Sequence, residues 1–200
     1  MQFVRDELPT APARVLEVGA GEGELAAALR DAGYDVLAID PAGEPPVVAV
    51  ALADLDEPDG SFDAAVAVVS LHHVEPLEES LEKLARMVRA GGALAVDELD
   101  AWALDERATA WWIERRRERD LETPLGAAEM VEEMRGHIHP VDRIYTLLGR
   151  SFELGPPLPG PYLHRWHLDL ALLPTEEALI AAGELPATGV RFSGTRRAAG

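Results

Sequence analysis

The segment Glu17-Val18-Gly19-Ala20-Gly21-Glu22-Gly23 decides the fold of this 200-residue chain. It continues a short apolar run from Val15 that predicts a buried strand. It then leads into residues 24–32, whose apolar side chains recur on one face of a helix that Gly33 closes. Glycine permits positive φ angles, and the N-terminus of a helix presents free N–H groups. This order indicates a site for a nucleotide-type ligand, the alternative being a merely tight turn.

The residues that follow complete a βαβ unit and start a second one. Asp35 to Ile39 predicts another buried strand, which ends at Asp40 and is stopped by Pro41. A helix between two such strands implies a parallel sheet. Residues 41–46 are too few for a crossover helix, although Val47 to Leu52 predicts a third strand. The second crossover is therefore predicted to be abbreviated.

Further along, the pattern of strand and helix repeats. Ala64 to Val69 is a continuous apolar run, typical of a central parallel strand covered on both faces. Apolar residues from Leu77 to Val88 recur at helical spacing, and Gly91-Gly92 ends that helix before a strand at Ala93 to Val96. The predicted fold class is α/β, with a doubly wound and mostly parallel sheet.

The second half of the chain is less regular. A helix is predicted over 104–121, and Thr123 with Pro124 predicts the start of another helix through Arg135. Thr175 is predicted to cap a helix through Ala182, ahead of a strand over 189–195. We expect a single domain over 1–200. It divides into a cofactor-binding core at 1–100, a helical insert or lid at 101–140, and a C-terminal part at 141–200 that completes the sheet.

Composition limits the partners. The formal net charge is -18, which opposes binding to nucleic acid. The longest apolar stretch, Val47 to Ala53, is far short of the roughly 20 residues that span a bilayer, so no membrane partner is expected. There is no cysteine, which fits a cytoplasmic protein.

The glycine spacing discriminates between ligands. The dinucleotide fingerprint is GxGxxG, but here the third glycine comes one residue early, and Glu22 and Glu24 would crowd a diphosphate. A ligand with an amino group and a sulfonium fits better, and S-adenosyl-L-methionine is such a ligand. An NAD(P)-dependent oxidoreductase on a related fold stays an alternative, as does a non-catalytic S-adenosylmethionine-binding regulatory domain.

Residues 14–100 resemble the core of class I S-adenosylmethionine-dependent methyltransferases, closest to the small-molecule branch that includes ubiquinone- and menaquinone-biosynthesis enzymes. The resemblance rests on the glycine segment, on Asp40 and Asp54 after successive strands, and on Ser61 to Val74 and Leu77 to Gly92. It implies a seven-stranded Rossmann-like sheet and methyl transfer to an N, O or C atom of a small-molecule acceptor. The abbreviated second crossover departs from the family pattern.

The resemblance also implies roles for individual residues. Glu17 and the loop would hold the methionine portion, Asp40 would accept hydrogen bonds from both ribose hydroxyls, and Asp54 would meet the adenine amino group. Leu55 would pack on the adenine ring, and the Ser70-Leu71 backbone would face the amino group or sulfonium. The expected cofactor-binding residues are Glu17, Gly19, Ala20, Gly21, Gly23, Asp40, Pro41, Asp54, Leu55, Ser70 and Leu71.

His72 and His73 follow the fourth strand, at the sheet edge where ligands bind in open α/β folds. One of them is a candidate to accept a proton from the acceptor, and the alternative is that they shape the pocket or cap the next helix. The remaining histidines have HxH and HxxH spacings, but a metal site needs three or four convergent ligands, and none is predicted.

Two aromatic and basic segments are candidates for the acceptor pocket and its lid. Trp111 and Trp112 each precede Arg115 by about one helical turn, and Tyr162, His164, Arg165 and Trp166 offer a similar mixture. Such a surface suits a flat or anionic acceptor. The alternative is that the tryptophans are core residues or contacts of a homodimer.

Overall fold

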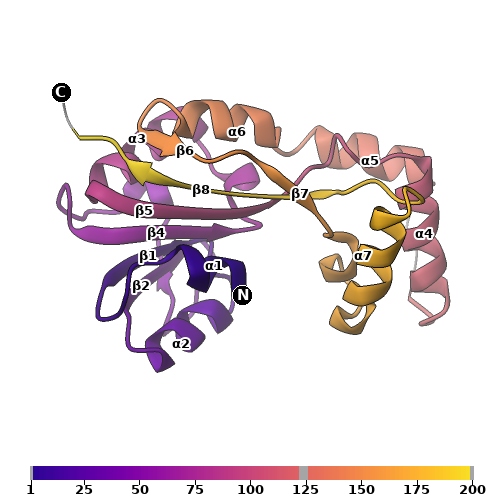
Figure 1. Ribbon diagram of the computed structural model, residues 1–200, viewed down its shortest axis with the longest axis horizontal. Helices are drawn as coiled ribbons and strands as arrows, with labels where there is room; N and C mark the ends of the chain where they lie inside the picture. Colours follow the sequence, from indigo (N-terminus) through magenta and orange to yellow (C-terminus); the bar gives the residue numbers. More distant parts are fainter. Residues whose placement is uncertain (1, 122–125, 199–200) are drawn as a thin grey trace. The chain divides into compact units, whose positions relative to one another are not determined.

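A computed structural model describes residues 2–121 and 126–198 (Figure 1). The chain forms two compact units. Unit 1 comprises Met1–Glu98, Asp142–Pro156 and Phe192–Gly200, and unit 2 comprises Leu99–Val141 and Pro157–Arg191. The insert expected at 101–140 lies in unit 2, whereas the stretch expected to complete the sheet, 141–200, is divided between the units.

The sheet confirms the predicted doubly wound, mostly parallel α/β fold. Its strand order is β3-β2-β1-β4-β5-β8-β6, with β7 pairing β8 beside this path. The pairs β1–β2, β1–β4, β2–β3 and β4–β5 are parallel, whereas β6 and β7 run antiparallel to β8. Within the described residues the sheet has eight strands rather than the expected seven. They are β1 (Arg14–Val18), β2 (Asp35–Asp40), β3 (Val48–Ala49), β4 (Phe62–Val68), β5 (Val88–Leu99), β6 (Phe152–Leu154), β7 (Leu158–Gly160) and β8 (Gly189–Arg196).

Helices cover both faces of the sheet in unit 1. In Figure 1, α1 and α2 lie on one side of the strands, and α3 and α6 lie on the other. The α-helices of the chain are α1 (Gln2–Glu7), α2 (Glu24–Asp31), α3 (Leu77–Met87), α4 (Glu106–Arg117), α5 (Ala127–Arg135), α6 (Val141–Leu148) and α7 (Leu173–Ala181). The 3-10 turns are η1 (Leu52–Asp54), η2 (Leu71–His73), η3 (Leu163–Arg165) and η4 (Leu170–Leu172).

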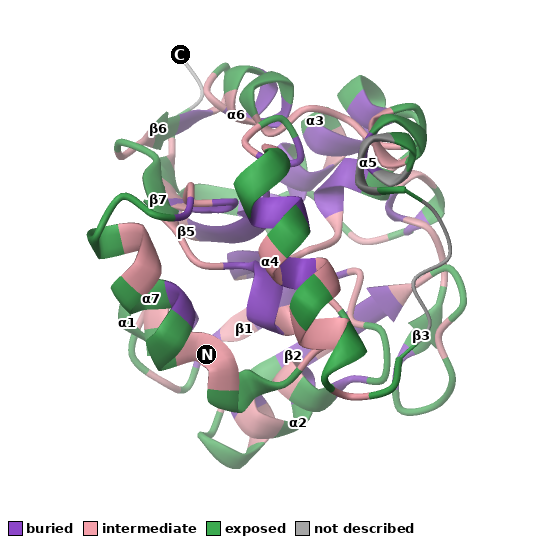
Figure 2. Ribbon diagram, turned by 90° about the vertical axis from the view of Figure 1, so that its right-hand side faces the viewer, coloured by how far each residue is buried: buried purple, intermediate pink, exposed green. Residues whose placement is uncertain are grey.

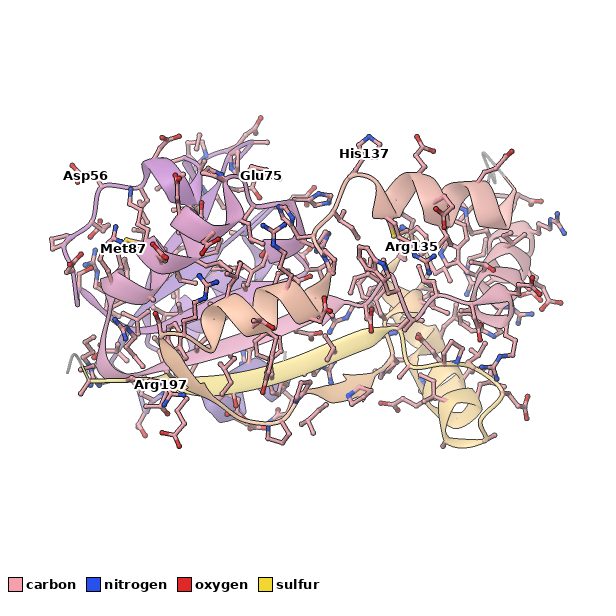
Figure 3. The ribbon with its side chains drawn as sticks, turned by 90° about the horizontal axis from the view of Figure 1, so that it is seen from above. Asp56, Glu75, Met87, Arg135, His137 and Arg197 are labelled. Carbon is pink, nitrogen blue, oxygen red and sulfur yellow. The ribbon has the colours of Figure 1, made fainter. Side chains whose placement is uncertain are left out.

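Strand alternation divides the core of unit 1 into two layers. Side chains on one face of the sheet, such as Val15 and Val66, pack with Ala26 and Leu29 of α2 in one cluster. On the α3 side, Met87, which Figure 3 labels at the end of that helix, is 1% exposed. Because both faces are covered, the central strands are apolar almost throughout, as the sequence predicted.

The abbreviated crossover is confirmed. Only seven residues separate β2 from β3, and the structure forms no helix among them. Val47 is buried there at 3% exposure, within reach of the loop glycines Gly23 and Gly43. The Val47 side chain thus covers these glycines, in the segment where the family pattern has a crossover helix.

Some predicted boundaries are wrong. Thr175 does not cap α7, since that helix begins at Leu173 with Pro174 in its first turn, where a missing N–H costs nothing. The strand expected over 47–52 is paired only at Val48–Ala49. Helix α1 was not predicted. The helix start expected at Thr123 and Pro124 lies outside the described residues.

Candidate functional site

A cavity of about 530 Å³ lies in unit 1 where the chain leaves β1, β2 and β4. The carboxyl ends of parallel strands meet at one edge of the sheet, so the loops after them face a common space. The volume suits a small-molecule ligand. The lining residues are Val18, Gly19, Gly21, Ile39, Asp40, Pro41, Ala42, Val50, Ala51, Leu52, Val69, Ser70, His73, Val74 and Glu75, the last labelled in Figure 3.

Two glycines of the loop after β1 have different tasks. Gly19 has φ +69°, and a Cβ placed on it would lie 2.2 Å from the Cβ of Ser70. Only a glycine therefore allows the loops after β1 and β4 to touch. Gly21 has φ +53° and would meet nothing within 4 Å, which leaves open space beside the backbone at the cavity.

Asp40, at the end of β2, fastens the same loop. Its Oδ2 accepts a hydrogen bond from the Gly21 N–H at 3.0 Å, and its Oδ1 accepts one from the Ala42 N–H at 2.9 Å. Each carboxylate oxygen has a second lone pair, and the side chain is only half-buried. Asp40 can hold the loop and still accept hydrogen bonds from a diol in the cavity.

Glu17 is a buried carboxyl group with unmet hydrogen-bonding capacity. It is 4% exposed, and its Oε2 has no hydrogen-bond partner within the part of the chain that the structure describes. Burial raises the pKa of Glu17 to about 7, against smaller opposing effects of Arg30 and a hydrogen bond from the Ala26 backbone. Glu17 lines a hollow of about 350 Å³ together with Gly19 and Glu22. An unpaired buried acid at this place suits a cationic or hydrogen-bond-donating group.

The predicted histidine pair is divided by the structure. His73 is exposed and lines the cavity, whereas His72 is 5% exposed, with its Nδ1 2.7 Å from Oε2 of Glu98. The two rings lie 4.2 Å apart. In the Ser70-Leu71 backbone, which was expected to face the ligand, both N–H groups donate to Oε1 of Glu98. A base role for either histidine stays a prediction.

The predicted adenine contacts lie next to the cavity rather than in its lining. Asp54 is exposed, and Leu55 is 6% exposed in the core. The preceding residues Ala51 and Leu52 line the cavity instead. The roles of Asp54 and Leu55 stay predictions. Sequence reasoning missed Ala51 and Leu52 as lining residues, and the signal that could have found them was the apolar run before Asp54.

The two segments proposed for the acceptor come together within unit 2. Trp112 stacks on Trp166 with ring centroids 4.4 Å apart, and its Nε1 donates to the Trp166 carbonyl at 2.8 Å. The Arg116 guanidinium lies over the Trp112 ring. Figure 2 shows the buried stripe of α4, to which Trp112 belongs at 3% exposure. Trp112 is a packing residue here, which agrees with the alternative reading of the tryptophans as core.

The other acceptor candidates are also engaged within unit 2. Glu176, fully buried, accepts hydrogen bonds from the N–H groups of Tyr162 and His164 and lies 2.8 Å from His164 Nδ1. Burial alone would raise the pKa of Glu176, but its hydrogen bonds hold that pKa below the ordinary value. Arg115 lies over the Trp111 ring at 5.9 Å. A contact of any of these residues with an acceptor stays a prediction.

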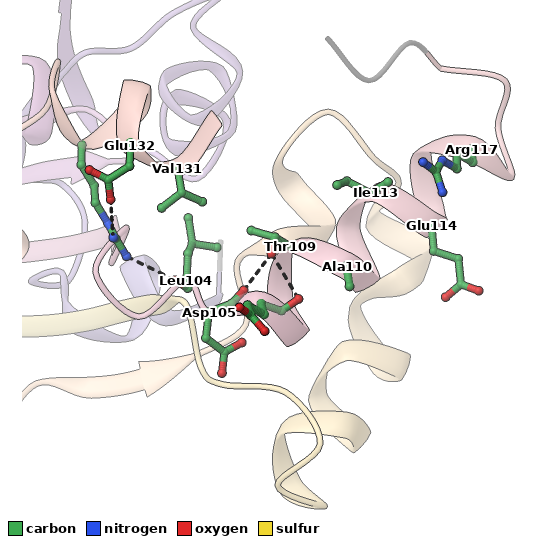
Figure 4. A pocket seen from close by; sticks show the side chains of 11 residues that line it. Leu104, Asp105, Thr109, Ala110, Ile113, Glu114, Arg117, Val131 and Glu132 are labelled. Carbon is green, nitrogen blue, oxygen red and sulfur yellow. Dashed lines mark hydrogen bonds and ion pairs between the residues drawn. The ribbon is translucent and has the colours of Figure 1, made fainter. Parts of the chain in front are cut away.

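A larger hollow, of about 740 Å³, lies in unit 2 along α4 and α5 (Figure 4). Its polar groups mostly satisfy one another. Arg135 donates to Glu132 and to the carbonyls of Ala101 and Leu104, and the Thr109 hydroxyl donates to backbone carbonyls of its own helix. Size alone does not identify a site, and this hollow has neither a glycine turn nor an unpaired buried group in its lining.

The structure also bears on metal ions and membranes. Among residues 2–121 and 126–198, no three His, Asp or Glu side chains are grouped so that they could hold a metal ion. No helix in the described ranges is both long and apolar enough to cross a bilayer. The expectation that the protein uses no metal stays a prediction.

The sheet order and the glycine loop define a Rossmann-like nucleotide-binding domain. The sequence matches the methyltransferase domain family over residues 2–136, and the chain belongs to that family. An uncharacterized methyltransferase of Mycobacterium tuberculosis is 32% identical over 115 residues, which cover 52% of this chain and 45% of that protein. The chain thus spans about half the length of the curated relatives it matches.

Solved structures support the same fold. An S-adenosylmethionine-dependent methyltransferase from Mesorhizobium loti has a TM-score of 0.62 at 18% identity, over 96% of this chain and 95% of that one. A 1,6-didemethyltoxoflavin-N1-methyltransferase from Burkholderia thailandensis, with bound 1,6-didemethyltoxoflavin and S-adenosylhomocysteine, has a TM-score of 0.57 at 17% identity. The match covers 94% of this chain and 72% of that one. The class I methyltransferase fold is confirmed, and membership of the quinone-biosynthesis-like branch stays a prediction.

Substitution of Gly19 and Gly21 distinguishes a glycine that is needed for close packing from one that leaves space for a ligand. Gly19→Ala and Gly21→Ala both place a side chain at positive φ, which costs about 1 to 3 kcal/mol. Only Gly19→Ala adds a clash with Ser70, so we expect it to lower the free energy of unfolding distinctly more than Gly21→Ala. Urea denaturation of both variants measures this. Equal losses would show that the loops do not depend on their close approach.

The raised pKa of Glu17 predicts a pH-dependent stability difference. Between pH 4.5 and about 7 the folded state binds more protons at Glu17 than the unfolded state, so its contribution to the free energy of unfolding falls as pH rises. Glu17→Gln does not show this fall in the free energy of unfolding, because a glutamine side chain does not bind or release a proton in this range. The variant should therefore gain stability relative to wild type between pH 5 and pH 8, by up to about 3 kcal/mol. If denaturant titrations give a difference in the free energy of unfolding between Glu17→Gln and wild type that does not change with pH, the raised pKa of Glu17 is contradicted.

Proposed function

We propose that this protein transfers a methyl group from S-adenosyl-L-methionine to an N, O or C atom of a small-molecule acceptor. The observation that carries the proposal is the cavity at the carboxyl edge of the sheet, where the open face of Gly21 adjoins the Asp40 carboxylate. Membership of the methyltransferase domain family supports it.

The residues present suit this cofactor. Asp40 would accept hydrogen bonds from the ribose hydroxyls, because its oxygens keep lone pairs beyond the two backbone bonds. Glu17, with its unpartnered Oε2, would meet the positively charged amino end of the methionine portion. Val50, Leu52 and Val69 add apolar surface for an aromatic base. When bound, the cofactor supplies an electrophilic methyl group on a sulfonium.

The chemical task left to the protein is alignment. Displacement at a sulfonium methyl group has a good leaving group, and well-oriented reactants gain effective molarities of about 10⁵ to 10⁸ M. The cavity walls would orient the reactants and exclude water. His73 lies on the cavity wall, where it would accept a proton from an acceptor hydroxyl or amine, whereas the ring of His72 contacts Glu98.

The rival functions have less support. A dinucleotide would bring a diphosphate to a loop flanked by Glu22, Glu24 and the buried Glu17, which is unfavourable for an anion. A binding domain without catalysis would use the same cavity, so turnover alone separates it from an enzyme. From the net charge of -18 we further infer that the protein does not bind nucleic acid, and we propose a cytoplasmic location because a sequence without cysteine fits a reducing compartment. A homodimer stays a prediction.

Asp40→Asn tests the ribose contact. The amide replaces one acceptor oxygen with a donor, so we expect binding of S-adenosylhomocysteine to weaken by about 1.5 to 3 kcal/mol. Isothermal titration calorimetry measures the change. Asp35→Asn is the matched control, since Asp35 lies at the other end of β2 with 79% of its side chain exposed. Unchanged affinity in a folded Asp40→Asn variant would refute the ribose assignment.

Transfer of a labelled methyl group tests the activity. The protein is incubated with methyl-labelled S-adenosylmethionine and a panel of small amines, phenols, carboxylic acids and carbon nucleophiles, and labelled products are separated from the cofactor. We expect transfer to at least one class, with inhibition by S-adenosylhomocysteine. Calorimetric binding of NADH without binding of S-adenosylhomocysteine would overturn the proposal.

A further inference from the structure

A second buried glutamate, Glu98 near the end of β5, supports the wall of the cavity from behind. Its side chain is completely buried. Oε1 accepts hydrogen bonds from the N–H groups of Ser70 at 2.9 Å and Leu71 at 2.6 Å, and Oε2 lies 2.7 Å from Nδ1 of His72. One carboxylate thus binds three successive residues at the start of η2. Buried N–H groups must be paired, and the first ones of a short turn have no partner within it.

The same arrangement occurs independently in unit 2. Glu176 accepts the N–H groups of Tyr162, Leu163 and His164, and its carboxylate also lies 2.8 Å from the His164 Nδ1. Both turns continue with Leu and His, and the residues before them have nearly identical backbone angles. Ser70 has φ -139° and ψ -34°, and Tyr162 has φ -139° and ψ -32°. The repetition indicates that a buried glutamate is what fixes a Leu-His turn in this geometry.

The turn in unit 1 borders the cavity. Val69, Ser70 and His73 line it, and so do the two residues that follow η2. The Ser70 hydroxyl donates to the carbonyl of Val18 at 2.6 Å, and the Ser70 side chain fills the space beside Gly19. Anything that displaces Ser70 therefore displaces the glycine loop as well.

The contact between Glu98 and His72 bears on which ring nitrogen of His72 carries the proton. With Glu98 ionised, the short contact needs an N–H at Nδ1, because an ionised carboxylate only accepts hydrogen bonds. In the neutral ring, Nε2 is then the nitrogen without a hydrogen, and thus the basic one.

We propose that Glu98 is a positioning residue of the cofactor cavity, which holds the turn from Ser70 to His73 against the glycine loop and fixes the proton of His72 on Nδ1. The part concerning cofactor affinity rests on the proposed function, whereas the part concerning His72 does not.

Three variants test the proposal. In Glu98→Gln, the amide oxygen can still accept from Ser70 and Leu71, but the amide nitrogen must donate to His72, which moves the ring proton to Nε2. In Glu98→Ala, both backbone N–H groups lose their partner. Glu176→Gln is the matched control, because it alters the same arrangement in the other unit. Circular dichroism and thermal melting establish that each variant is folded.

Two readouts are measured on the full chain. Calorimetry should give a dissociation constant for S-adenosylhomocysteine that rises about tenfold or more in Glu98→Ala but changes little in Glu98→Gln and Glu176→Gln. ¹⁵N NMR of the imidazole rings at high pH, with the His72 signals assigned by their loss in His72→Asn, should show N–H at Nδ1 in wild type and at Nε2 in Glu98→Gln.

Each failure has a distinct meaning. A folded Glu98→Ala variant with wild-type affinity would overturn the positioning role, as would an unchanged His72 tautomer in Glu98→Gln. If Glu98→Ala does not fold, the tautomer in Glu98→Gln decides. If wild type itself does not bind S-adenosylhomocysteine, the proposed function fails, and the NMR result still tests the action of Glu98 on His72.

Discussion

The contact between Gly19 and Ser70 is the constraint on which the site depends. It brings the loop after β1 against the loop after β4 so closely that a Cβ on Gly19 would overlap the Ser70 side chain. The adjacent parallel strands β1 and β4 hold the bases of both loops in register. Because these two loops are in contact, the unfilled space at the carboxyl edge lies beside Gly21 and Asp40, where the backbone faces the cavity. The cavity is therefore the space that is left at this edge once the two neighbouring loops are in contact.

Three carboxyl groups at this edge differ in how far their hydrogen-bonding capacity is used. Glu98 is fully buried and holds a turn, so its role is structural support of the wall. Asp40 binds two backbone N–H groups but is half-buried and keeps lone pairs toward the cavity. Glu17 is buried with an unpartnered oxygen and a pKa raised to about 7. Buried polar groups without partners are costly, so the unsatisfied member of the set is the one that a ligand would stabilise.

Local patterns in the sequence were sufficient for the parallel core and for part of the site. The glycine spacing, the strand ending at Asp40 and the short second crossover all depend on neighbouring residues, and the structure agrees with them. The hydrogen-bond partners of Glu98 could not be predicted from the sequence because they lie 26 to 28 residues away. The sequence also could not show that Trp112 would be covered by Trp166, a pairing across 54 residues. Helical spacing identifies which residues share a face, but not what that face packs against.

The central claim is that the cavity beside Gly21 and Asp40 binds S-adenosylmethionine. The most direct test is a ¹H–¹⁵N NMR titration of the assigned full chain with S-adenosylhomocysteine. Binding in this cavity predicts the largest amide shifts at Gly19 to Gly23, at Asp40 and Ala42, and at Val69 to Glu75. Saturable shifts confined to other segments, such as α4 and α5 along the larger hollow, or no shifts at all, would contradict it.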